Sequence, residues 1–187
     1  MLLTLNAHAA DPRAERVRPI VTINAAKDQN KLTSYDTTGT MVVENQQFGA
    51  VEQRPFILRA RGKEIVSSGD WKDYSFTFTP EKSGYAWVSL EGEYPPKEQP
   101  DIVFQVDFDT LVVIGAEIKN GDFEETSEDG KVTAWQYSAK VIQNDGKSAR
   151  SGSRFVTATA KNRIGQAIKV TAGQAVTISF SARAHNP

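Results

Sequence analysis

Two sequence patterns meet in residues 111–125, LVVIGAEIKNGDFEE, and their junction decides how the chain folds. The run VDFDTLVVIGA at 106–116 alternates between apolar and polar residues, as the last strand of a β-domain does. The run NGDFEE at 120–125 reads instead as the start of a domain. A domain that begins two thirds of the way along a chain of 187 residues needs a physical explanation.

Bulk composition limits the classes of function. The chain is long enough for one ordinary domain or two small ones. Its 22 Lys and Arg against 23 Asp and Glu give a net charge of -1, so no basic field would hold nucleic acid or an anionic membrane. No apolar run is long enough to span a bilayer.

Cysteine is absent and histidine is scarce. Zero Cys excludes disulfides, thiolate catalysis and cysteine-based zinc sites. The two histidines, His8 and His185, lie near the chain ends, which argues against catalysis by a histidine general base.

The first residues resemble the end of an export signal. A short apolar piece precedes Ala7-His8-Ala9, which has the small-x-small form of a signal-peptidase site. No basic segment comes before it, so residues 1–16 are either a clipped signal remnant or a disordered start. We expect a secreted, bacterial-type protein with its folded part at 17–187.

Period-two alternation dominates the rest of the chain. The segments are rich in Val, Ile, Phe and Thr and are separated by Gly, Pro, Asn and Asp turns, which predicts an all-β antiparallel sandwich or jelly roll. The predicted strands are 19–25, 40–45, 55–66, 73–80, 84–94, 101–113, 119–125, 133–142, 154–161, 164–171 and 175–184.

The back part of the chain resembles one half of a known module. Residues 115–184 are similar to the amino-terminal half of a carbohydrate-binding module of the family 4/9 type, a galactose-binding-like jelly roll. The matching pieces are NGDFEE, Trp135 after a turn, SGSRFVTATA at 151–160 and RIGQAIKVTAGQAVTISFSARA at 163–184. The later strands of such modules resemble residues 17–113, which here come first.

The exchanged order allows two interpretations. Either the chain is a circular permutant, in which 17–115 is the carboxy-terminal part of the module and 116–187 the amino-terminal part, or it is cut across two tandem modules. Each half alone would leave open sheet edges and a half-covered core. We therefore favour a single permuted jelly roll, as a monomer or a strand-swapped dimer.

The resemblance implies non-catalytic binding of a polysaccharide or oligosaccharide on one sheet face. Alternation in 84–91 turns Tyr85 and Trp87 away from the core, where an indole could stack on a sugar ring unless a loop or partner covers it. Polar partners expected on the same face are Arg59, Arg61, Thr77 and Gln105.

Four further aromatic or amide residues are expected to have structural or solvated positions. Trp71 and Trp135 follow turns, and we expect them to pack in the core at the ends of the sandwich. Tyr94 belongs to a solvated loop. Gln166 matches a recurrent family position and serves either structure or ligand.

In modules of this type, the first and last strands often hold a structural calcium ion. That implies Asp109 and Glu124 as metal ligands, against the alternative of two solvated carboxylates. The alternative functions are a structural or assembly module and, third, a glycoside-cleaving enzyme that works through these carboxylates. We expect no enzyme, because no catalytic motif is present and the carboxylates lie at strand ends.

Overall fold

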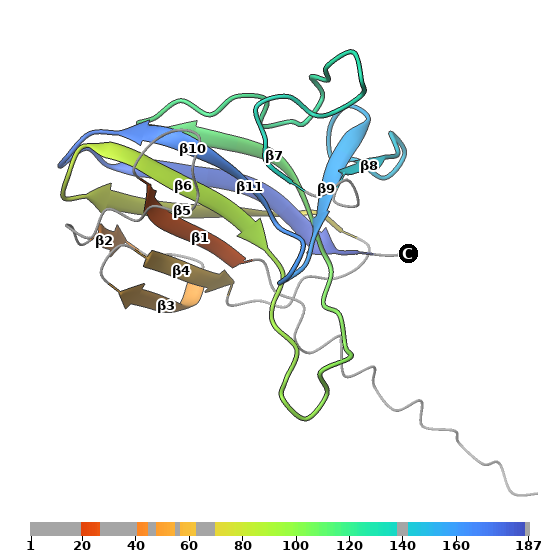
Figure 1. Ribbon diagram of the computed structural model, residues 1–187, viewed down its shortest axis with the longest axis horizontal. Helices are drawn as coiled ribbons and strands as arrows, with labels where there is room; N and C mark the ends of the chain where they lie inside the picture. Colours follow the sequence, from red (N-terminus) through yellow and green to blue (C-terminus); the bar gives the residue numbers. More distant parts are fainter. Residues whose placement is uncertain are drawn as a thin grey trace, which may run out of the picture.

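The computed structural model describes residues 20–26, 41–44, 48–54, 57–62, 70–137 and 142–185. Within these ranges the regular structure is entirely β-strand, arranged as two antiparallel sheets (Figure 1). Sheet A has the order β10 (Ile164–Val170), β6 (Gly84–Glu91), β1 (Ile20–Ala26), β4 (Ile57–Gly62) and β3 (Phe48–Arg54). Sheet B has the order β2 (Met41–Glu44), β5 (Lys72–Pro80), β11 (Val176–Ala184), β7 (Val106–Ile114), β9 (Arg154–Ala158) and β8 (Ile142–Asn144).

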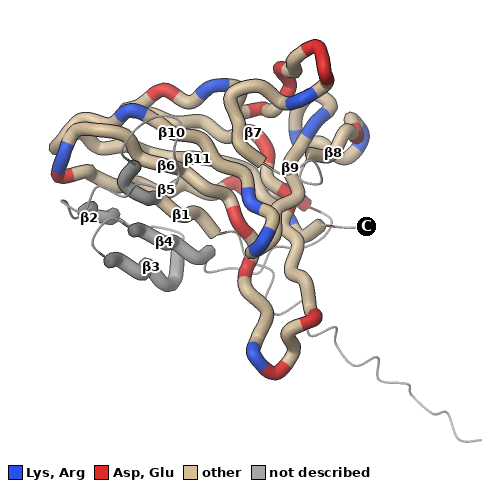
Figure 2. The backbone as a smooth tube through the Cα atoms, viewed as in Figure 1, with Lys and Arg blue, Asp and Glu red and all other residues tan. Residues whose placement is uncertain are grey.

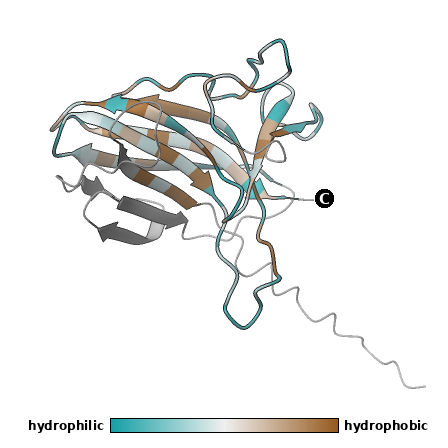
Figure 3. Cartoon of the chain, viewed as in Figure 1, coloured by the Kyte–Doolittle hydropathy of each residue, from teal (hydrophilic) through white to brown (hydrophobic). Residues whose placement is uncertain are grey.

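Alternation explains which face of each strand is buried. In β5 the side chains of Tyr74, Phe76 and Phe78 are buried, whereas Ser75 and Thr77 on the other face are partly exposed. Hydrophobic and hydrophilic residues also alternate along other coloured strands, such as β11 (Figure 3). One apolar layer between the sheets results, so the predicted all-β antiparallel sandwich is confirmed.

Strands from the two parts of the chain interleave within each sheet. In sheet B, β11 lies between β5 and β7, and β9 pairs with the other side of β7. In sheet A, β10 pairs with β6. The core accordingly contains Phe123 and Phe180 from the back part together with Phe76 and Val88 from the front part. Phe155, also from the back part, is buried outside this cluster, against Trp71.

The predicted strand at 119–125 is wrong. Asn120 and Phe123 adopt positive φ angles of 50° and 63°, and the Asn120 side chain bonds to the backbone N–H and C=O of Glu125. A side chain thus takes the place of a partner strand. Gly121 makes the close approach feasible, since a Cβ there would lie 1.9 Å from the Leu111 carbonyl oxygen.

Three other expectations differ from the structure or lie outside it. Strand β3 was not predicted from the sequence. In the predicted strand 133–142, the described residues hold only a bridge at Gln136 and the start of β8, because 138–141 lie outside the described ranges. Residues 1–16, with the expected signal remnant, also lie outside them. No helix in the described ranges is long and apolar enough to span a membrane.

Candidate functional site

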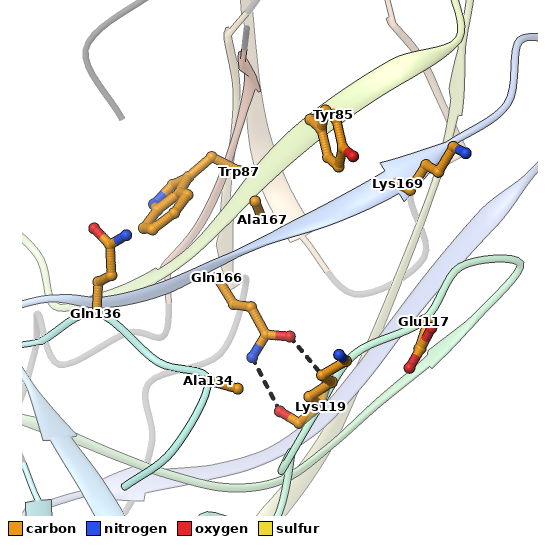
Figure 4. Close-up of a pocket in the computed structure, with 9 residues that line it drawn as sticks. All are labelled: Tyr85, Trp87, Glu117, Lys119, Ala134, Gln136, Gln166, Ala167 and Lys169. Atoms are coloured by element: carbon orange, nitrogen blue, oxygen red, sulfur yellow. Dashed lines mark hydrogen bonds between the residues drawn. The ribbon is translucent and has the colours of Figure 1, made fainter. Parts of the chain in front are cut away.

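A groove of about 450 Å³ lies on the outer face of sheet A, where the β10 edge meets the 115–137 segment (Figure 4). One wall is the sheet, and the other is the segment that follows β7. The lining residues are Tyr85, Trp87, Glu117, Lys119, Ala134, Gln136, Gln166, Ala167 and Lys169.

The sheet wall is formed by side chains that alternation turns away from the core. On β10, Ala167 pairs with Trp87 of β6, and Lys169 pairs with Tyr85. The intervening residue Ile168 belongs to the core. Two neighbouring strands therefore present an aromatic pair and an ammonium group to the same groove.

Trp87 forms the floor of the groove and is only 2% exposed. Its indole packs on Gly165, where a Cβ would lie 2.4 Å from the indole Nε1. Figure 4 shows the Gln136 side chain beside the ring. Our expectation of an open stacking surface at Trp87 is thus wrong, and the alternative of a covered indole is correct. Among the described residues, none accepts a hydrogen bond from Nε1–H.

Gln166 holds the second wall in place. Its Oε1 accepts the Lys119 N–H at 2.8 Å, and its Nε2 donates to the Lys119 carbonyl at 3.0 Å. The side chain is buried, so this two-point clamp is well shielded from water. Of the two roles open to Gln166, the structure assigns the structural one, because its amide already bonds to the backbone.

A backbone pair fixes the rest of this wall. Gln136 and Gly165 exchange both N–H···O bonds, each at 3.0 Å, so the segment continues sheet A beyond β10. Trp135 turns inward, stacks against Phe123 and donates its Nε1–H to the Asn120 carbonyl at 2.7 Å. This core packing of Trp135 was expected from the sequence.

Two of the other residues expected to bind sugar lie on the opposite sheet from the groove. Thr77 lies on β5 of sheet B, with its Oγ1 2.9 Å from that of Thr177, and the exposed Gln105 directly precedes β7 of sheet B. Their predicted position on the face of Trp87 is wrong. Arg59 and Arg61 lie on β4 of sheet A, separated from β6 by β1, and their side chains are not among those described.

Sequence reasoning missed Glu117, Lys119, Gln136 and Lys169. The first three belong to an irregular segment in which no periodicity predicts where a side chain points. Lys169 could have been found, because it alternates onto the face opposite Ile168 and Val170.

The two carboxylates expected to bind calcium are surrounded by hydrogen-bond donors. Asp109 Oδ2 accepts the N–H groups of Arg150 and Ser151 at 2.8 and 3.0 Å, and its Oδ1 accepts that of Thr110 at 2.6 Å. Burial raises the pKa of Asp109 above its ordinary value, against the lowering effect of these N–H groups.

Glu124 binds the next residues of the same loop. Its Oε1 accepts the N–H groups of Ser153 and Arg154 at 2.7 and 2.6 Å, and its Oε2 accepts the Ser153 hydroxyl at 2.8 Å. Although burial alone would raise the pKa of Glu124, the bonds from Ser153 and Arg154 hold it below its ordinary value.

The oxygens of both carboxylates already have hydrogen-bond donors from the protein. Oxygens that accept N–H bonds have their lone pairs directed at donors rather than at a shared cation. The described residues also contain no group of three His, Cys, Asp or Glu side chains placed to hold a metal. The calcium site stays a prediction from the resemblance.

A buried ionic cluster lies on the outer side of sheet B. Asp107 is 0% exposed and accepts hydrogen bonds from Arg183 Nε at 3.1 Å and from the Thr157 hydroxyl at 2.7 Å. The Nδ1 atom of His185 lies 2.8 Å from Oδ1 of Asp107, the oxygen that also accepts the Thr157 hydroxyl. Sequence reasoning missed this role of His185, since only the fold brings it beside Asp107.

Trp71 belongs to this cluster and not to the core. The guanidinium of Arg183 lies 4.4 Å from the centroid of its ring, and its Nε1 donates to the Ser148 carbonyl. The expected core packing of Trp71 is therefore wrong. The guanidinium of Arg183, which is only 12% exposed, holds the ring on the outer face of the sheet through a cation–π contact.

Comparison with known protein families, with curated protein sequences and with solved structures finds no match to this chain.

Proposed function

We propose that this protein binds an oligosaccharide or polysaccharide, without cleaving it, in the groove between sheet A and the 115–137 segment. The observation that carries the proposal is the composition of this groove. An aromatic pair on the sheet, Tyr85 and Trp87, faces amide and charged side chains on the opposite wall. Its volume of about 450 Å³ lies within the usual range for ligand sites, about 300–1,000 Å³.

Each part of the groove matches a part of a sugar. The partly exposed ring of Tyr85 offers an apolar surface to the C–H groups of a pyranose face. The Trp87 Nε1–H offers a donor to a hydroxyl oxygen. The exposed amide of Gln136 can donate to one hydroxyl and accept from the next.

The resemblance of the two chain parts to a carbohydrate-binding module supports the same function. It also supports a permuted order, since strands of both parts are neighbours in each sheet. Folds of this kind also serve structural roles, so the fold alone is not evidence for glycan binding. The evidence is the set of residues that line the groove.

Affinity electrophoresis and calorimetry with a panel of neutral and acidic polysaccharides test the proposal. Tyr85→Ala should weaken binding about tenfold or more, the loss expected from one aromatic contact of about 1.4 kcal/mol. Tyr94→Ala, at an exposed loop tyrosine that does not line the groove, is the matched control and should bind normally. Equal affinities for both variants, or no binding to any glycan, would overturn the proposal.

A structural or assembly role is the second candidate. Val112 and Ile114 expose 54% and 68% of their surface on the outer face of sheet B, and apolar residues in such a position favour association. Light scattering over a range of concentrations separates the two functions. Growth in mass that Ile114→Lys abolishes, with no glycan bound, would favour assembly.

A further inference from the structure

The charges around the groove point to the kind of glycan it takes. Three charged side chains line it: Lys119 and Glu117 from the 115–137 segment, and Lys169 from β10. The groove therefore carries one net positive charge, whereas the whole chain carries a net charge of -1. Figure 2 shows a basic residue on β10, and both basic and acidic residues along the segment that follows β7.

Neither lysine forms an ion pair with a described residue. Several arginines elsewhere in the described residues do: for example, Arg154 pairs with Glu124, Arg163 with Glu91 and Arg183 with Asp107. Both lysines are exposed, so their ammonium groups remain available to a ligand. A carboxylate or sulfate placed between them would meet two cations that have no competing ion-pair partner among the described residues.

The fold fixes the backbone positions of the two lysines that carry the ammonium groups. The backbone of Lys119 is held at both its N–H and its carbonyl by Gln166. Lys169 is held in the sheet directly opposite Tyr85. Figure 4 shows Lys119 and Lys169 on opposite walls of the groove, with Tyr85 on the strand next to that of Lys169. A sugar stacked on Tyr85 therefore lies beside Lys169.

We propose that the groove binds an anionic glycan, with the charged group of one sugar residue held between Lys119 and Lys169 while its ring contacts Tyr85. This inference rests on the proposed glycan binding and narrows it to a ligand class. Lysine suits the task because its ammonium is a point charge that accepts any orientation of an anion. Glu117 on the same wall opposes the anion and weakens its binding.

The experiment measures affinity by calorimetry for polygalacturonate, whose charge is a carboxylate, for carrageenan, whose charge is a sulfate ester, and for neutral xylan. Lys119→Gln and Lys169→Gln should each lower the affinity for the anionic glycan about two- to fivefold, as exposed ion pairs do. Glu117→Gln should raise it by a similar factor. Lys161→Gln, at an exposed lysine that does not line the groove, is the matched control and should change nothing.

Salt provides a second readout. Binding of the anionic glycan should weaken as ionic strength rises, and the double variant should lose most of this dependence. Whichever of the two anionic glycans binds in this lysine-dependent way identifies the charged group.

The two proposals fail in different ways. Binding of xylan that depends on Tyr85 but not on either lysine would overturn the anionic ligand and leave glycan binding intact. Absence of binding to all three polysaccharides would overturn both.

Discussion

At the scale of the residue, Gly165 decides where Trp87 goes. The indole is large and its strand turns it away from the core, yet it is buried because a residue without a side chain lies beneath it. A tryptophan on an outer face predicts an open binding surface only if its cross-strand neighbours leave it uncovered. Here Gly165 of the neighbouring strand packs against it, Gln136 lies beside it, and only 2% of Trp87 is exposed.

Gly165→Ala should therefore disturb the groove. The new Cβ would lie 2.4 Å from the Trp87 Nε1, so the indole must move or the strands must separate. Overpacking of this kind costs about 1–3 kcal/mol. Denaturant unfolding should show that loss, together with a shift in tryptophan emission. Gly146→Ala, where a Cβ meets only ordinary contacts, is the control, and equal stability of both variants would contradict this account.

Glu124 gives the fold an acid-sensitive contact. Its pKa in the folded state is lower than the ordinary value of 4.5, so the ionised carboxylate stabilises the fold above pH 4.5. That contribution is lost as the pH falls below 4.5 and through the folded-state pKa.

Glu124→Gln tests this contact. At pH 7 the variant should unfold with a free energy about 1.5–3 kcal/mol lower than the parent, the usual value of hydrogen bonds to a charged group. The gap should narrow as the pH falls below 4.5, because protonation weakens the same bonds in the parent. Urea titrations over a pH series measure it, with Glu128→Gln at an exposed site as the control. A gap that does not vary with pH would contradict the assignment.

Asp107 is the counter-ion of a buried cluster. Asp107→Ala leaves Arg183, which is only 12% exposed, without its carboxylate. Breaking one side of a buried pair costs about 3–5 kcal/mol. Thermal unfolding should show a large drop in Tm, whereas Asp129→Ala, in an exposed pair with Lys131, should show little change. Similar Tm values for the two variants would show that the cluster does not support the fold.

At the scale of the element, strands with strict alternation were predicted correctly and irregular elements were not. The segments 73–80, 164–171 and 175–184 match β5, β10 and β11 closely because their apolar faces are continuous. Strand β3, FGAVEQR, lacks such a face and lies at the edge of sheet A, where backbone pairing to β4 defines it. The NGDFEE segment has the alternation of a strand, but the Asn120 side chain bonds to the Glu125 backbone and an irregular turn forms instead.

The wall of the groove depends on one amide. Gln166→Leu keeps the size of the side chain but removes both bonds to Lys119, which leaves two backbone groups without partners at a cost of about 1–3 kcal/mol. We expect faster hydrogen exchange at the Lys119 amide and weaker glycan binding, with both sheets preserved. Gln174→Leu, at an exposed turn, should leave the exchange unchanged. Wild-type protection at Lys119 in the first variant would contradict the clamp.

At the scale of the whole molecule, the sequence predicted the sandwich but not the site. Period-two patterns report which face of a strand is buried, and that is enough to define two sheets around a core. They do not report which strands are neighbours, so Thr77 and Gln105 were assigned to the face of Trp87 although they belong to sheet B. Residues such as Lys119 and Gln136 reach the groove through tertiary contacts that leave no periodic signal.

Interleaved strands predict one cooperative unfolding transition. Strand β11, from the back part of the chain, lies between β5 and β7, which come from the front part. The two parts therefore cannot separate unless the pairings of β11 with both β5 and β7 break. Circular dichroism and tryptophan fluorescence should therefore give the same midpoint in urea. Two separated transitions would favour the tandem-module interpretation over a permuted single fold.

The pairing of Gln136 with Gly165 has a consequence beyond the groove. A strand at the border of a sheet offers a row of backbone donors and acceptors to any extended chain that arrives. By pairing with Gly165, the 115–137 segment covers one position of that row on β10. The residues that shape the groove thereby also shorten the stretch of this border that is open to another chain.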